Sequence, residues 1–224
     1  HTTINSDMLI LTGNTQTKSS YSGLVDNIKT VPVPCIPSQL RPNLQVNSGF
    51  LWFGGAGAVH KGLDLVLDAI DESSSDIILD ICGPIEKEKD FIMLYKNSFL
   101  RSNIKFHGMV DVSSNEMQKL IDRNSFVILP SCSEGMASSV ITCMQFGLIP
   151  IISKECGIDI KDHGILIEEI TVLGVKKAIN KALKLNPEEI LRMKNKAIKF
   201  VEKNNSHDSF RISLSNSLMS VFTK

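Results

Sequence analysis

The chain has 224 residues, of which 42% are apolar and 21% are charged, a composition typical of a globular protein with a full hydrophobic core. Its 24 basic residues balance 24 acidic ones, which argues against nucleic-acid binding through bulk electrostatics, so we expect no nucleic-acid partner. No apolar run reaches the roughly 20 residues that a membrane-spanning helix needs.

The first 48 residues predict two short strands followed by a stiff connector. Apolar residues at 8–11 and 28–33 are typical of strands, and four prolines then fall between residues 31 and 42, which favours an extended chain. About thirty residues are too few to form a core of their own. We therefore interpret residues 1–33 as a remnant of an N-terminal domain and residues 34–48 as a hinge.

From residue 49 onward, continuous apolar runs alternate with amphipathic patterns of helical spacing. The runs predict strands at 50–53, 77–82, 104–106, 126–129, 148–152 and 165–167. The helical patterns lie at 63–70, 91–100, 117–121, 171–185, 187–204 and 206–222. Apolar strands that alternate with helices indicate a doubly wound parallel sheet, a Rossmann-like α/β fold. We assign residues 49–205 to this domain and expect residues 206–224 to pack back toward the N-terminal domain.

In such a sheet, ligands bind beyond the carboxyl ends of the strands, where this chain places glycine-rich turns. The turn GGAGAVHKGLD is no phosphate-binding P-loop, because Gly62 follows Lys61, and no GxGxxG fingerprint, because the last position of that motif is His60. What remains is a turn whose backbone amides can approach an anion while Lys61 supplies a positive charge. Taken alone, Lys61 is equally compatible with a solvated lysine at a helix start.

The stretch LPSCSEGMASSVIT at 129–142 leads from a buried strand into a helix. The free amides at the helix start and the positive end of its dipole favour phosphate near residues 136–139. The carboxylate of Glu134 is suited instead to accept hydrogen bonds from sugar hydroxyls. Taken alone, Glu134 could simply flank the helix. Together with Lys61, it favours a ligand that carries both phosphates and hydroxyls, a nucleotide sugar.

The motifs KGLD, ICGP, IKFHGMVD, PSCSEGMASSVITCMQFGLIPIIS and ECGID follow one another along the chain. Their order resembles the C-terminal, donor-binding domain of retaining GT-B glycosyltransferases of family 4, the glycosyl transferases group 1, of the bacterial surface-polysaccharide type. The resemblance covers residues 49–205 and is most specific over 126–157. It implies the donor half of an enzyme that moves a sugar from a nucleoside-diphosphate sugar to an acceptor hydroxyl with retention, in polysaccharide, O-antigen or capsule biosynthesis.

The resemblance also implies the residues of the site. Lys61, on the donor diphosphate, and Glu134, on the donor sugar, would be the catalytic pair. The other donor-binding positions are expected at Gly135, Met136, Ala137 and Ser138 for the distal phosphate and sugar, at Gly108, Met109 and Val110 for the base, and at Gly55, Ala56 and Gly83 on the same rim. No metal and no cofactor are expected, because the positive end of the helix and basic side chains would stabilise the diphosphate in place of a metal ion.

Two positions depart from the pattern of the family. Thr142 stands where a second glutamate holds the ribose, and a neutral hydroxyl contributes about half of a charge-assisted hydrogen bond. Gly55 and Ala56 stand where an arginine is common, and His60 could compensate for it when protonated. These departures leave open a catalytically degenerate module that acts as a non-catalytic partner. A weaker alternative is another enzyme of this architecture, such as a sugar-nucleotide epimerase.

The partners implied by the resemblance are the donor, the missing N-terminal domain and a saccharide or lipid-linked saccharide acceptor. Because the acceptor site would lie in the missing domain, the isolated chain is predicted to bind donor but to transfer nothing. The sequence does not distinguish UDP from GDP donors. Five scattered cysteines without a CxxC pair indicate reduced thiols in a cytoplasmic protein, with peripheral placement at the inner face of the membrane as an alternative. His107 is expected to be structural, and His163 to lie in a surface turn.

Overall fold

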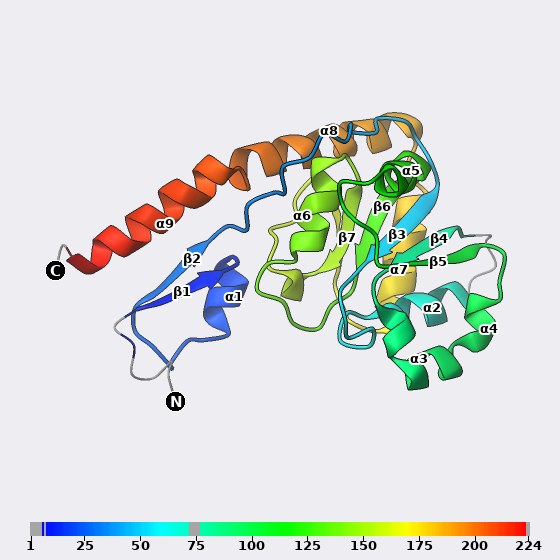
Figure 1. Cartoon of the computed structure of the whole chain (residues 1–224), viewed down its shortest axis with the longest axis horizontal. Helices are drawn as coiled ribbons and strands as arrows, with labels where there is room; N and C mark the ends of the chain where they lie inside the picture. Colours follow the sequence, from blue (N-terminus) through cyan, green and yellow to red (C-terminus); the bar gives the residue numbers. More distant parts are fainter. Residues whose placement is uncertain (1–5, 7, 72–76, 223–224) are drawn as a thin grey trace.

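The computed structural model describes residues 6, 8–71 and 77–222, and its main feature is a six-stranded parallel sheet (Figure 1). The strands are β3 (Gly49–Phe53), β4 (Leu79–Cys82), β5 (Ile104–Gly108), β6 (Asn124–Leu129), β7 (Ile149–Ser153) and β8 (Ile165–Ile167). They lie in the order β5-β4-β3-β6-β7-β8. Every residue of β4, β6 and β7 is buried, which explains why these strands are mostly apolar.

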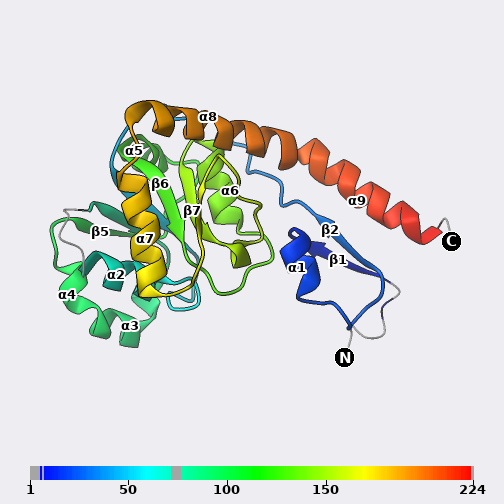
Figure 2. The ribbon, with the colours of Figure 1, turned by 180° about the vertical axis from the view of Figure 1, so that it is seen from behind.

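Helices cover both faces of this sheet. They are α2 (Leu63–Asp71), α3 (Lys89–Leu94), α4 (Lys96–Phe99), α5 (Asn115–Arg123), α6 (Ser138–Gln145), α7 (Val172–Leu183) and α8 (Pro187–Asn204), with short 3-10 turns η1 (Ile85–Lys87) and η2 (Lys154–Cys156). α6 lies in front of the sheet in Figure 1, and α7 lies in front of it in the reverse view of Figure 2. α2 packs against α7, and α8 packs against α6 and β7. The expected doubly wound α/β fold is therefore confirmed.

The predicted elements match the structure to within two residues at each end, with one exception at 91–100. That pattern predicts one helix, but the structure has α3 and α4, divided at Tyr95. Phe91 still packs on Tyr95, with ring centroids 4.7 Å apart. Ser98 in the second half donates a 2.6 Å hydrogen bond to Asp71, the last residue of α2.

The N-terminal residues form a small unit at one side of the sheet (Figure 1). It consists of β1 (Leu9–Thr12), α1 (Thr15–Ser19) and β2 (Ile28–Val31), and its two strands pair in parallel. Residues 32–48 then run to β3 without any helix or strand, as their prolines predict. The division of the chain into domain remnant, hinge and donor domain stays a prediction.

The last helix, α9 (His207–Phe222), extends from the end of α8 to the N-terminal unit, where it packs against β2 (Figure 1). At the junction of α8 and α9, the Cys35 amide donates to the Asn205 carbonyl at 2.7 Å. The Asn205 side-chain amide donates to the Val33 carbonyl at 2.8 Å. The two segments that connect the N-terminal unit with the sheet are thus bonded to one another. No helix in the described ranges is long and apolar enough to cross a membrane.

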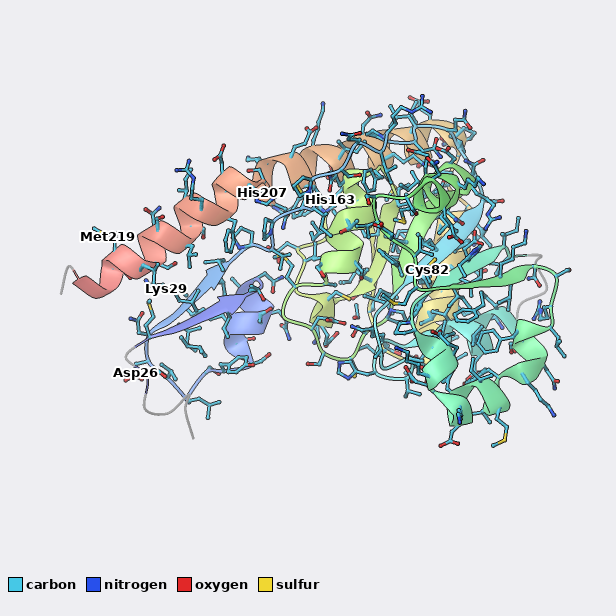
Figure 3. The ribbon with its side chains drawn as sticks, viewed as in Figure 1. Asp26, Lys29, Cys82, His163, His207 and Met219 are labelled. Carbon is cyan, nitrogen blue, oxygen red and sulfur yellow. The ribbon has the colours of Figure 1, made fainter. Side chains whose placement is uncertain are left out.

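Two histidines outside the rim have structural surroundings. His163 lies in the expected turn (Figure 3), but its side chain does not face the surface: the residue is 4% exposed, and its ring stacks on Phe200 of α8 with centroids 4.4 Å apart. Lys161 and Asp162 take the exposed positions of this turn, and burial lowers the pKa of the His163 imidazole. His107 Nε2 lies 2.7 Å from Oδ1 of the fully buried Asp80. This contact agrees with the structural role expected of His107.

Candidate functional site at the carboxyl end of the sheet

Two charged side chains that are 73 residues apart in the chain meet at the carboxyl end of the sheet. Lys61 lies in the turn after β3, and Glu134 lies in the loop after the neighbouring strand β6. The Lys61 Nζ lies 2.5 Å from Glu134 Oε1, and the two side chains are 18% and 17% exposed. Ser131 Oγ donates to the same carboxylate oxygen at 3.1 Å. The rim thus holds one positive and one negative group, sheltered from water but still reachable.

The turn that carries Lys61 is fixed against the end of β6 by close backbone approach. Gly62 has a φ of +68°, and a Cβ there would lie 2.4 Å from the Pro130 carbonyl oxygen. The Cys132 amide donates to the His60 carbonyl at 3.0 Å, and Trp52 Nε1 donates to the Lys61 carbonyl at 3.3 Å. Because only glycine fits at position 62, the two loops can lie side by side, and Lys61 reaches Glu134.

The first glycine-rich turn is only partly free for a ligand. We expected its backbone amides to approach an anion, but a carboxylate of the chain already holds two of them. Glu88 Oε1 accepts from the Gly57 amide at 2.8 Å, and Glu88 Oε2 accepts from the Ala58 amide at 3.0 Å. Gly55 and Ala56, the two predicted donor-binding positions of this turn, are exposed. A phosphate could therefore approach Gly55 and Ala56, while the turn beyond them is closed by Glu88.

The second loop, which begins at Glu134, is likewise partly engaged. The Ala137 amide donates to the Cys156 carbonyl at 2.9 Å. We expect this amide to face a ligand, but in the structure it is already bonded within the chain. Gly135 and Ser138 are exposed, and Ser138 begins α6. The Met136 sulfur accepts from the Val33 amide at 3.3 Å and from Asn205 Nδ2 at 3.4 Å. The Met136 side chain thus contacts the connector and the end of α8 rather than the rim.

Three glycines close the rim on the side of β4 and β5. The Gly54 amide donates to the Cys82 carbonyl at 3.0 Å, and the Gly83 amide donates to the Gly108 carbonyl at 2.8 Å. A Cβ at Gly83 would lie 2.5 Å from the Gly54 carbonyl oxygen. Gly83 is buried, and it lets neighbouring strands end at the same level. The structure supports a role for Gly83 in the close approach of two turns more directly than contact with a ligand.

The remaining predicted donor-binding residues are divided between surface and core. Met109 is 70% exposed beside Gly108, whereas the side chain of Val110 packs in the core. Thr142 is 2% exposed, and its hydroxyl donates to the Ser138 carbonyl at 2.9 Å within α6. The structure does not bring Thr142 to the rim. The contacts expected of these residues with base and ribose stay predictions.

A cavity of about 550 Å³ lies between the N-terminal unit and the loop after β6. Its lining residues are Leu11, Thr12, Thr17, Ser20, Tyr21, Ser133, Glu134 and Gly135. The N-terminal wall is rich in hydroxyl groups, and sequence reasoning missed it. The hydroxyl-rich run between residues 12 and 22 is the signal that could have found it. The cavity has Glu134 on one wall and hydroxyl groups on the other, a lining suited to a polar ligand.

Side-chain contacts hold the N-terminal unit against this cavity. Asn14 Nδ2 donates to Asp159 Oδ1 at 2.7 Å, and Thr17 Oγ1 donates to the Gly135 carbonyl at 2.7 Å. A Cβ at Gly157 would lie 1.9 Å from that same carbonyl oxygen, so glycine is required there too. Within residues 6, 8–71 and 77–222, no three His, Cys, Asp or Glu side chains gather in a way that could hold a metal ion.

The fold and the rim define an α/β domain of the GT-B glycosyltransferase type. Sucrose-phosphate synthase from Thermosynechococcus elongatus superposes with a TM-score of 0.78 at 15% identity, over 99% of this chain and 60% of that one. Anabaena Alr3699/HepE in complex with UDP and glucose gives a TM-score of 0.77 at 13% identity, over 96% of this chain and 64% of that one. Both likenesses concern the fold.

The sequence then places the chain in a family. Residues 41–200 match Glycosyl transferases group 1, so the chain belongs to this family, as the motifs predict. An uncharacterized glycosyltransferase from Haemophilus influenzae is 27% identical over 147 residues, which cover 62% of this chain and 40% of that protein. The chain therefore spans less than two thirds of the length of each of these proteins.

Proposed function

We propose that the chain is the donor-binding part of a glycosyltransferase that transfers a sugar from a nucleoside-diphosphate sugar to an acceptor hydroxyl with retention. The observation that carries the proposal is the Lys61–Glu134 pair at the edge of the cavity. One cation and one carboxylate at a single point match a ligand with a diphosphate on one side and sugar hydroxyls on the other. The relative from Anabaena was crystallised with UDP and glucose, which supports a donor of this class.

In the proposed reaction, Lys61 acts on the leaving diphosphate. Negative charge develops on the diphosphate as its bond to the sugar breaks, and a cation held in place before the reaction stabilises that charge. Glu134 holds the ammonium group in advance, and Ser131 donates to the same carboxylate oxygen. The exposed start of α6 at Ser138 adds the positive end of a helix dipole. The proposal assigns no metal and no cofactor to the reaction.

Glu134 is assigned to the sugar. Its carboxylate is an acceptor only, and it faces the cavity that Thr12 and Tyr21 line from the other side. Hydroxyls of a bound sugar would donate to Glu134 while Lys61 turns toward the diphosphate. A module freed from donor binding would have no use for this arrangement, which argues against the non-catalytic alternative. The acceptor and a surface-polysaccharide pathway remain part of the proposal through the sequence resemblance.

Calorimetric titration with UDP, GDP and their sugar derivatives tests the proposal. Lys61→Ala should weaken nucleotide binding at least about tenfold, because a hydrogen bond to a charged group contributes about 1.5–3 kcal/mol. Lys154→Ala is the matched control, since Lys154 is an exposed lysine on η2. Glu134→Gln should remove the advantage of a sugar nucleotide over its diphosphate and leave diphosphate binding intact.

Two results would count against the proposal. Equal effects of the Lys61 and Lys154 substitutions would remove Lys61 from the donor site. Absence of binding for every nucleotide, repeated with a longer protein that includes the acceptor domain, would reject donor binding altogether.

A further inference from the structure

Cys132 and His60 form a second chemical pair beside the donor rim. Cys132 is exposed, and its Sγ lies 3.3 Å from His60 Nδ1. The other ring nitrogen, Nε2, lies 2.8 Å from the Ser133 carbonyl oxygen. A carbonyl can only accept a hydrogen bond, so Nε2 carries the hydrogen and Nδ1 presents its lone pair to the thiol. This is the arrangement of a nucleophile with an adjacent base.

The backbone holds this pair in place. The Cys132 amide donates to the His60 carbonyl at 3.0 Å, and Ser131 Oγ lies 3.3 Å from the same carbonyl. The neighbouring charged groups, Lys61 and Glu134, are paired with each other. The imidazole is therefore the group that faces the thiol as a base, and little rearrangement is needed for proton transfer.

The other four cysteines are less accessible than Cys132, because three are buried and Cys35 is half-buried. Cys82 is buried within the sheet domain (Figure 3), and burial raises its pKa to about 12. Burial raises the pKa of Cys156 to about 11 and that of Cys143 well above its usual value. Cys35 is half-buried, and its pKa is also raised by burial. A reagent that needs an accessible thiolate should therefore discriminate strongly among the five thiols.

We infer that Cys132, with His60 as its base, is a reactive thiol that forms a mixed disulfide with small-molecule disulfides. His60 Nδ1 takes the thiol proton, and Cys132 Sγ attacks one sulfur of the disulfide. The Sγ–S bond forms as the original S–S bond breaks, and the departing thiolate takes the proton back from His60. The disulfide is the oxidant, and it is reduced to one free thiol and one sulfur bound to Cys132.

The adduct would stand next to Ser131 and Glu134. If this rim binds the donor as proposed above, the adduct should block nucleotide-sugar binding, and reduction should restore it. The thiol chemistry itself does not depend on that proposal, so the two are tested separately.

The first experiment measures the alkylation rate of each cysteine with iodoacetamide by peptide mass spectrometry on the folded chain. Cys132 should react about tenfold faster near neutral pH than the same residue in the chain unfolded in urea. His60→Gln should reduce that rate to the unfolded value. His207→Gln, a substitution of an exposed histidine at the start of α9 (Figure 3), should leave it unchanged. An equal rate in the parent and His60→Gln chains, or faster reaction at another cysteine, would overturn the inference.

The second experiment incubates the chain with oxidised glutathione, then measures the adduct mass and titrates UDP. The adduct should form at Cys132, disappear with dithiothreitol and be absent in Cys132→Ser. A parent chain that forms no adduct would contradict the inference. Adduct formation in a chain that never binds UDP would uphold the reactive thiol and would count only against a UDP donor. Unchanged UDP binding in the modified chain would place the thiol outside the nucleotide contact.

Discussion

Thr17 Oγ1 donates a 2.7 Å hydrogen bond to the Gly135 carbonyl and thereby joins α1 to the loop that carries Glu134. Thr17 is buried, and a Cβ at Gly157 would lie 1.9 Å from the same carbonyl oxygen. The position of the second loop thus depends on residues that are distant from it in the chain. One wall of the cavity is set by a contact between the N-terminal unit and the sheet domain.

Thr17→Val should loosen this contact. The substitution keeps the size of the side chain but removes a hydroxyl that donates to the Gly135 carbonyl and accepts from the Asn14 amide at 3.3 Å, and each lost hydrogen bond costs about 1 kcal/mol. Urea denaturation should show a loss of that order, together with weaker binding of sugar nucleotides. Thr15→Val on the exposed side of the same helix is the control. Equal stability of the two variants would show that the bond does not hold the loop.

Gly62→Ala should destabilise the chain more than most glycine substitutions. Its φ of +68° disfavours alanine, and the added Cβ would lie 2.4 Å from the Pro130 carbonyl oxygen, so we expect a loss of about 1–3 kcal/mol. Gly55→Ala, whose Cβ would lie 3.8 Å from Lys61 Cε, should have little effect on stability. Chemical denaturation of both variants tests this, and a Gly62→Ala chain as stable as the parent would contradict it.

The stability of the chain should rise with pH in the alkaline range because of Lys194. This lysine is fully buried, donates to the Asn43 carbonyl at 3.1 Å, and has its pKa lowered by burial from 10.5 to about 8. Between those two values, the unfolded chain binds more protons than the folded one, so the free energy of unfolding increases with pH. The gain across this window is at most about 3 kcal/mol.

Urea denaturation at several pH values between 7 and 10.5 would measure this effect. Lys194→Met removes the titrating group and keeps an unbranched side chain, so its stability should depend less on pH in that window. The same pH slope in both chains would show that Lys194 does not titrate as its burial implies.

The chain should transfer no sugar by itself. Its cavity has only a short N-terminal unit on one wall, whereas the relatives described above are longer. Incubation with UDP- and GDP-sugars and a saccharide acceptor should give no product by mass spectrometry. Fusion to the remaining residues of an acceptor domain should restore transfer, and Lys61→Ala should abolish it there. Product formation by the chain alone would refute this prediction.

Much of the fold could be predicted from the sequence, because strands that are buried on both faces of the sheet appear as runs of apolar residues. β6 and β7 are completely buried, and their sequences are apolar from Phe126 to Leu129 and from Ile149 to Ile152. The meeting of Lys61 and Glu134 was also predictable, because each follows a strand that ends at the same edge of the sheet. Local pattern and strand topology were sufficient for these features.

Long-range contacts explain what the sequence did not predict. Glu88 lies about 30 residues from the amides it holds, and no local pattern distinguishes it from its charged neighbours Glu86 and Lys87. Thr142 looks like a ligand residue in the motif, yet its hydroxyl bonds back within α6. His163 has polar neighbours in sequence, while its ring lies against Phe200. For Glu88 and His163 the partner depends on how distant elements pack, whereas the Thr142 hydroxyl bonds four residues back in its own helix.

The contacts of Met136 give the second loop a mechanical role. Its sulfur lies between Val33, where the chain leaves the N-terminal unit, and Asn205, where the chain returns toward it. Both crossings between the N-terminal unit and the sheet domain therefore contact one side chain, and Met136 is only two residues from Glu134. The shortest bonded path from either crossing to the carboxylate, counting these hydrogen bonds, runs through this loop and not through the sheet.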